Sequence, residues 1–287
     1  MLAALVSLPH PFDAAFMERA LLEVLLLSVP GGILGSWIVL RRLAFFTHGV
    51  GTAAFPGLVL AGPIGVAPQL AALGSAVLYA FGLDRLVRGR RIAPDAATGL
   101  LLVGALALGV VLASDVFESG AGVDRLLFGS LLGLGDLDLW LTAGTAVGVL
   151  ALDIGLRRAW LVEGFDPGAG RRLGVPAAVG DRLLVLAIAV SAVVALAAVG
   201  ALLVTSVFVV PAATVRLLAP SVNALRAGAV ALAAVQGTAA LWLAYELDIG
   251  PGPALAVLGG VIFGLVALSV AARGRFRASA RLREARA

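Results

Sequence analysis

The sequence predicts an all-α protein whose helices cross a membrane many times. Of its 287 residues, 61% are apolar and 13% are charged, about half the charged fraction of a typical soluble domain. The charges are separated by long uncharged runs, and none of the 33 residues between Arg182 and Arg216 is charged. A membrane span needs about 20 apolar residues. We therefore expect one transmembrane domain over residues 1–287, with a membrane core at 16–272 and a basic cytoplasmic tail at 273–287.

The uncharged runs predict the spans in order. They are Val24–Leu40, whose helix begins near Phe16, Leu43–Leu83, Ala96–Ser114, Leu139–Leu156, Leu183–Val215, Ala227–Tyr245 and Ile249–Ala272. The second run is long enough for two spans, and Gly62, Pro63 and Pro68 mark the turn between them. The fourth run is slightly short for a span and carries Asp153.

The run Leu183–Val215 is too long for one upright span and too short for two straight spans with a loop. Gly200 and Pro211 lie inside it, where a helix can bend or break. We expect one full span followed by a broken or shortened one, which gives nine spans in total. A single tilted helix here is the alternative and gives eight.

The arginines predict the orientation of the spans. All basic residues are arginine, and nine spans place most of them on one face of the membrane, while acidic loops alternate on the other: Asp115, Glu118, Asp124, Asp136, Asp138, Glu246 and Asp248. Basic loops face the cytoplasm, so the N-terminus is expected outside and the C-terminus inside a bacterial cytoplasmic membrane. Arginines spread over short loops do not indicate nucleic-acid binding.

Small residues in the first span, Gly31, Gly32 and Gly35, form a face suited to close helix packing in lipid. Packing against neighbouring helices of the same chain is favoured over a dedicated dimer interface.

The residue types argue against an enzyme. The chain has no cysteine and two histidines, His10 and His48, without a metal-hydrolase pattern. A P-loop needs a lysine to reach nucleotide phosphates, and the sequence contains none. No catalytic residue and no catalytic cofactor are expected, so any ATP-driven work belongs to another subunit.

Two segments are candidates for function. The first is the loop over residues 163–176. Asp166 and Pro167 predict the start of a short helix, and Gly174 and Pro176 end it. Such a helix suits docking to a soluble partner; an ordinary surface turn is the alternative.

The second is the segment around His48. His48 is the only ionisable side chain in the run Leu43–Leu83, and polar groups at membrane depth are usually functional. It also lies near Arg42, so a position at the cytoplasmic interface is the alternative.

Four ordered motifs resemble the membrane subunit of bacterial zinc and manganese ABC importers. They are Arg41 to Phe46 continuing to Phe55-Pro56-Gly57, Phe165-Asp166-Pro167 to Leu173-Gly174-Val175-Pro176, Leu202 to Thr214 with Arg216, and Asp248 with Pro251-Gly252-Pro253; Leu127-Phe128-Gly129-Ser130 is a weaker match. The resemblance implies a helical permease that works by alternating access with a second copy of itself, an ABC ATPase and an extracytoplasmic solute-binding protein. It implies docking of the ATPase on the loop residues Phe165, Asp166, Pro167, Arg171, Arg172, Leu173 and Gly174.

One departure concerns the cargo. The family's second span usually carries Asp-Ala-Leu-Ser-His-Ala, whose aspartate and histidine contact the metal; here His48 replaces the aspartate and Thr52 the histidine. The resemblance implies a pathway along His48, Gly51, Thr52 and Pro56, with His48 as the metal ligand. Imidazole suits zinc better than manganese, which prefers carboxylate. Gly49 and Gly51 are expected to widen the pathway, so a metal complex or an organic solute is an alternative cargo.

A secondary carrier without an ATPase is the competing class. Such a protein would normally need intramembrane carboxylates to couple ions, and Asp153 is the one acidic residue inside a predicted span. The sequence therefore favours an importer subunit driven by a separate ATPase.

Overall fold

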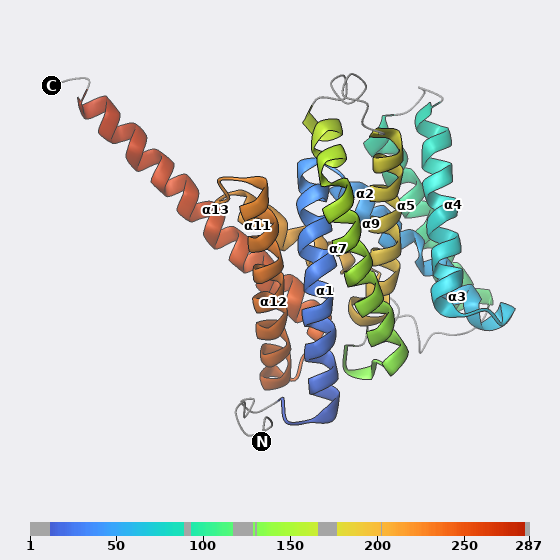
Figure 1. The fold of residues 1–287 in the computed structure, drawn as a ribbon. Coiled ribbons are helices and arrows are strands. Elements are labelled where there is room, and N and C mark those ends of the chain that lie inside the picture. Colours follow the sequence, from blue (N-terminus) through green and yellow to red (C-terminus); the bar gives the residue numbers. More distant parts are fainter. Residues whose placement is uncertain are drawn as a thin grey trace.

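A computed structural model describes residues 12–88, 93–116, 129, 131–165, 177–201 and 203–284. Every regular element in these ranges is a helix, which confirms the predicted all-α class. The helices form an upright bundle that α13 leaves at an angle (Figure 1).

The helices fall into two groups by length. The long ones are α1 (Ala15–Leu40), α4 (Pro68–Arg88), α5 (Pro94–Val111), α7 (Asp136–Phe165), α9 (Ala177–Val199), α12 (Val222–Leu247) and α13 (Pro251–Glu284). The short ones are α2 (Ala44–Ala53), α3 (Phe55–Ile64), α10 (Val204–Phe208) and α11 (Val210–Arg216), with a π turn at Leu112–Val116 and a 3-10 turn at Leu131–Gly133.

Seven described segments are long and apolar enough to cross a membrane, and Ala44–Ile64, which joins α2 and α3, is one of them. The other two predicted spans correspond to shorter apolar helices, Pro68–Leu83 and Val204–Arg216.

The predicted break in the long uncharged run is confirmed. α9 ends at Val199, and Gly200 has φ +76°, the left-handed conformation that commonly follows a helix and suits glycine. The chain then forms α10 and α11, which are separated at Val209. Pro211 lies in the first turn of α11, where proline costs no hydrogen bond within α11 but cannot donate back to a carbonyl of α10.

A second break, between α2 and α3, was not predicted. Pro56 lies at the start of α3 and has no N–H to donate to the carbonyl of Thr52. The helical hydrogen bonds are therefore interrupted just past Thr52, at Ala54, whose backbone angles stay helical.

The glycines of α1 serve packing within the chain, as predicted. A Cβ at Gly31 would lie 3.2 Å from the carbonyl oxygen of Val207, a Cβ at Gly32 would overlap the backbone of Val230, and a Cβ at Gly35 would overlap the carbonyl oxygen of Phe208. α1 is thereby held against α12 and against the broken pair α10–α11.

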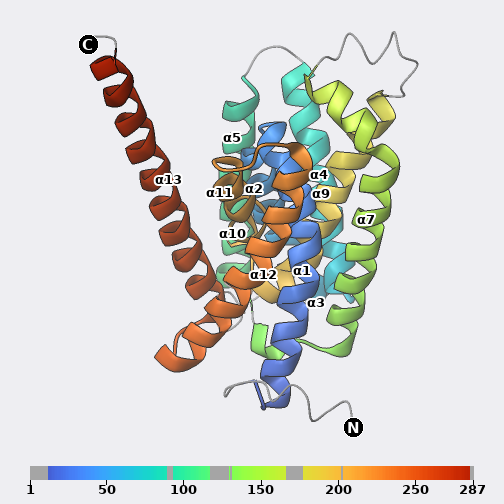
Figure 2. The ribbon, with the colours of Figure 1, turned by 60° about the vertical axis from the view of Figure 1, so that its left-hand side comes forward.

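Several helices end at the same end of the bundle at which others begin. α1, α4 and α7 finish at the end where α9 and α12 begin (Figure 1). α13 stands apart from α5 along most of its length (Figure 2).

Candidate functional site

His48 of α2 faces the broken segment. Its Nδ1 lies 3.0 Å from Oγ1 of Thr205 on α10, and the side chain is half-buried. The interaction joins a helix from the first third of the chain to one from the last third. Each helix borders a break in its span, although His48 itself lies within the regular part of α2 and Thr205 lies in the first turn of α10.

Thr52 and Gly51 lie further along the same helix. Thr52 is fully buried, and within the described part of the chain its Oγ1 has no hydrogen-bond partner. Thr52 follows His48 by one helical turn, so both lie on one face of α2. A Cβ at Gly51 would lie 3.3 Å from the carbonyl oxygen of Ala201. Pro56, also buried, completes the predicted pathway residues at the start of α3.

The expectation that Gly49 and Gly51 widen a passage is wrong for the single chain. A Cβ at Gly49 would overlap the hydroxyl of Tyr79, and a Cβ at Gly51 would meet Val204. The space that the glycines leave is filled by neighbouring atoms, so they allow α2 to pack closely between α4 and α10.

One chain alone offers few metal ligands at this site. The described residues contain no group of three or more histidine, cysteine, aspartate or glutamate side chains that could hold a metal ion. His48 contributes one imidazole, and Thr52 and Thr205 contribute hydroxyl groups. A complete coordination sphere would therefore need ligands from another chain or from solvent.

The predicted docking loop is described only at its start. Phe165 is the last residue of α7, and 70% of its surface is exposed. The other predicted docking residues lie outside the described residues: Asp166, Pro167, Arg171, Arg172, Leu173 and Gly174. Arg41 connects the helices on either side of this loop: it forms an ion pair with Asp181 of α9 and donates to the carbonyl oxygen of Trp160 on α7 at 3.4 Å.

Asp153 is part of a buried polar network. It forms an ion pair with Arg226 of α12, and its side chain is fully buried. It also accepts a hydrogen bond from Nε1 of Trp37 at 2.9 Å. Trp37 meets Trp160 edge to face, with ring centroids 5.5 Å apart. The carboxylate is therefore fully engaged in holding α1, α7 and α12 together.

Glu23 is a second intramembrane carboxylate that the sequence analysis missed. It lies on α1, is 1% exposed, and its Oε1 accepts a hydrogen bond from Oγ1 of Thr142 at 2.7 Å. The statement that Asp153 is the one acidic residue within a span is therefore wrong. The sequence offered a signal for Glu23: apolar residues continue before Val24 towards Phe16, so Glu23 lies within the span and not at its boundary.

Comparison with known proteins identifies the family. The sequence model of the ABC 3 transport family matches residues 13–271. The manganese transport system membrane protein MntC of Halalkalibacterium halodurans is 28% identical over 251 residues, covering 88% of this chain and 86% of that protein. The manganese import system permease protein ScaB of Streptococcus parasanguinis is 28% identical over 260 residues, covering 91% and 92%.

Solved structures share the fold. PsaBC from Streptococcus pneumoniae, in complex with Fab, superposes with a TM-score of 0.81 at 24% identity, covering 88% of this chain and 91% of that chain. An inward-facing metal-chelate type ABC transporter superposes with a TM-score of 0.67 at 18% identity. The chain belongs to the ABC 3 transport family: it is a membrane-spanning permease subunit of an ABC transporter in the bacterial plasma membrane, with ATP hydrolysis on a separate subunit.

Proposed function

We propose that this permease imports a divalent first-row metal ion, zinc or manganese, and that His48 contacts the ion during passage. The observation that carries this proposal is His48 beside Thr205 at the meeting of two broken helices, in a chain whose relatives are named manganese permeases. A neutral imidazole is a good ligand for first-row metals. Two copies facing one another would supply two imidazoles together with the hydroxyls of Thr52 and Thr205.

The proposed topology has nine membrane crossings over the core 16–272, with the N-terminus outside and the basic tail 273–287 in the cytoplasm. One observation supports this topology. The ends of α1, α4 and α7 lie at the same end of the bundle as the starts of α9 and α12 (Figure 1), and the arginines are found at these helix ends. The pair α10–α11 then returns the chain across part of the membrane.

The proposed partners are an ABC ATPase, a second copy of this permease and an extracytoplasmic solute-binding protein. The ATPase docks on residues 163–176. Exposed Phe165 supports this assignment because, together with Leu40 and Arg216, it lines a cavity at the end of the bundle that carries the arginines. The acidic loops at the opposite end would receive the binding protein.

The metal preference can be tested by uptake into proteoliposomes that contain the permease, the ATPase and the binding protein. We expect wild-type protein to take up radioactive zinc faster than manganese, and His48→Ala to lower both rates at least about tenfold, the effect of losing about 1.4 kcal/mol of interaction with the ion. His48→Asp restores a carboxylate and should shift the preference towards manganese. Thr205→Val removes the partner of His48 and one proposed hydroxyl ligand but leaves the imidazole, so a smaller loss than in His48→Ala is expected if the imidazole is the main ligand.

Wild-type uptake rates in His48→Ala would show that the ion passes elsewhere. A metal complex is the second candidate cargo, because the family's anionic ligand is absent at His48. Uptake of a zinc chelate with no uptake of free zinc or manganese by the same proteoliposomes would favour that candidate.

A further inference from the structure

A groove runs along the outer surface of the bundle between α7 and α9. It has a volume of about 390 Å³ and is lined by Gly144 and Gly148 of α7 and by Leu183, Leu186 and Val190 of α9. A second cavity of about 180 Å³ opens where α7 begins, and Gln69 and Asp138 contribute its polar surface. Leu141 lines both cavities, so they adjoin at that side chain, and together they offer an apolar body and a polar end.

The apolar body of this site faces the membrane. Large side chains of α7 beside it are strongly exposed, with Trp140 at 76%, Val147 at 69% and Ile154 at 68%. A Cβ added at Gly144 or at Gly148 would meet no atom within 4 Å. The groove is therefore open along the glycines, and in a bilayer its contents come from the lipid phase.

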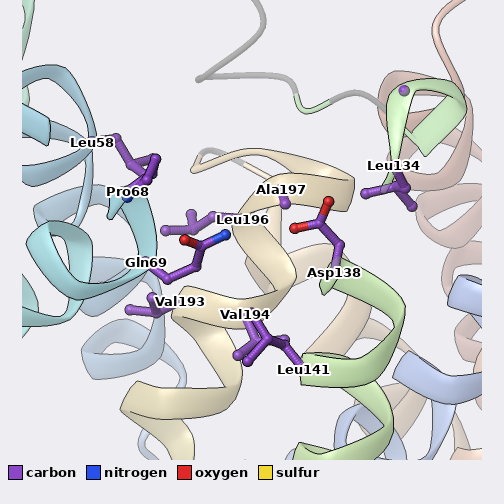
Figure 3. Close-up of a pocket in the computed structure, with 11 residues that line it drawn as sticks. Leu58, Pro68, Gln69, Leu134, Asp138, Leu141, Val193, Val194, Leu196 and Ala197 are labelled. Carbon is purple, nitrogen blue, oxygen red and sulfur yellow. The ribbon is translucent and has the colours of Figure 1, made fainter. Parts of the chain in front are cut away.

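The polar end carries a carboxylate that pairs with no cation among the described residues. Figure 3 shows the side chains of Gln69 and Asp138 directed towards one another across the cavity. Asp138 is half-buried and accepts a hydrogen bond from the backbone N–H of Gly135 at 3.0 Å, but it forms no ion pair with any residue that the structure describes. Nearby Asp136, in contrast, pairs with Arg19 at 3.1 Å.

Ser191 adds an unsatisfied donor within the apolar body. It is 1% exposed, it lines the groove, and its hydroxyl has no partner among the described residues. A buried hydroxyl without a partner costs about 1–3 kcal/mol. Along α9 it lies about 9 Å from Ala197, at 1.5 Å per residue, and Ala197 lines the polar cavity.

We propose that this site binds a phospholipid whose headgroup carries a primary ammonium, such as phosphatidylethanolamine. The ammonium group pairs with Asp138, and the amide of Gln69 donates to the phosphate. The hydroxyl of Ser191 donates to an ester carbonyl, and one acyl chain lies over Gly144 and Gly148. The inference goes beyond the cargo and its pathway, and depends only on the location of the chain in a membrane.

A lipid fits this groove better than a transmembrane helix does. Gly144 and Gly148 have the spacing typical of helix pairs in membranes, but the space lies between α7 and α9, which pack on one another. The charge of Asp138 at the polar end favours a lipid, because an ammonium headgroup joined to a slender acyl chain complements both ends of the groove.

The test measures lipid retained by the purified permease. Protein is delipidated in detergent, titrated with phosphatidylethanolamine or phosphatidylcholine, and analysed by native mass spectrometry. We expect wild-type protein to bind phosphatidylethanolamine roughly tenfold more tightly, because the trimethylated headgroup of phosphatidylcholine has no N–H to donate to Asp138. Asp138→Asn should remove this preference, Ser191→Ala should weaken binding of both lipids, and Gly148→Leu should abolish it.

Gly155→Leu is the matched control for Gly148→Leu. Gly155 also lies on α7 and a Cβ there also meets no atom within 4 Å, but it does not line the groove. It should bind lipid as wild-type protein does. If Gly148→Leu failed to fold, Asp138→Asn and Ser191→Ala would carry the test, because they preserve the shape of the groove.

Three results would overturn the proposal. One is retention of lipid by Gly148→Leu at the wild-type level, and another is equal binding of the two lipids by wild-type protein. The third is a change of oligomeric state in Gly148→Leu, measured by light scattering, with lipid binding unchanged, which would assign the groove to a helix of a second copy.

Discussion

Trp37 on α1 donates its indole N–H to Oδ1 of Asp153 on α7 at 2.9 Å, and the other carboxylate oxygen of Asp153 pairs with Arg226 on α12. Three helices from distant parts of the sequence thus meet at one buried carboxylate. Such a group holds its helices in a fixed arrangement, and its removal leaves Arg226 without its counter-ion and an indole N–H without a partner.

Replacing Asp153 with alanine should destabilise the permease strongly. Breaking a buried ion pair by removing one partner costs about 3–5 kcal/mol, and Asp153 is fully buried. Asp181→Ala is the matched control, because Asp181 also pairs with an arginine but its side chain is 44% exposed, so its loss should cost less than the loss of Asp153. Denaturant unfolding in detergent measures both values, and equal losses would show that burial does not set the strength of these pairs.

Gly35→Ala should disrupt the packing of α1 on the broken segment. The new Cβ would overlap the carbonyl oxygen of Phe208, and backbone must move to relieve the overlap, at a cost of about 3 kcal/mol. At Gly104 on α5 a Cβ meets no atom within 4 Å, so Gly104→Ala should leave stability unchanged or raise it by up to about 1 kcal/mol. Thermal unfolding of the two variants compares them, and similar midpoints would contradict the packing assigned to Gly35.

Thr52→Val should separate transport from stability. Valine has nearly the shape of threonine but removes a buried hydroxyl that lacks a partner in the described structure, so the free energy of unfolding should stay equal or rise. If the hydroxyl contacts the cargo, metal uptake should fall roughly tenfold. Uptake in proteoliposomes and unfolding in detergent provide the two values. A stable variant with wild-type uptake would remove Thr52 from the pathway.

Arg41→Ala should weaken coupling to the ATPase more than it weakens the fold. Arg41 connects α7 and α9 on either side of residues 166–176 through Trp160 and Asp181, so its loss should free the proposed docking loop. We expect ATP-driven uptake to fall severalfold while the midpoint of unfolding changes little.

The double variant Arg41→Ala/Asp181→Ala serves as the internal check on this coupling. If the two residues act through their ion pair, it should lose no more uptake than the more affected single variant. Additive losses would show that Arg41 and Asp181 act independently.

Much of the fold could be predicted because the membrane requires long uncharged helices. The run Leu183–Val215 and its break at Gly200 and Pro211 were predicted, since both residues act locally on the backbone. The break at Ala54 was missed although Pro56 was visible, because proline in a membrane helix can also produce a kink without a break. Glu23 was missed because its charge was taken as a boundary, although Thr142 of another helix satisfies it.

For the candidate site, the sequence supplied the residues but not their partners. His48 and Thr52 could be placed on one face of a helix from their spacing, while the contact with Thr205 could not, since it joins residues far apart in the chain. Gly49 and Gly51 were expected to leave space, and Tyr79 and Val204 fill it.

The sequence by itself determined the helical class, the membrane location and the absence of a P-loop, because these follow from composition and from the length of uncharged runs. Only the tertiary structure decided which buried charges are paired, which glycines are covered and which face the lipid. Those outcomes depend on distances between helices, and local preferences along the chain do not contain that information.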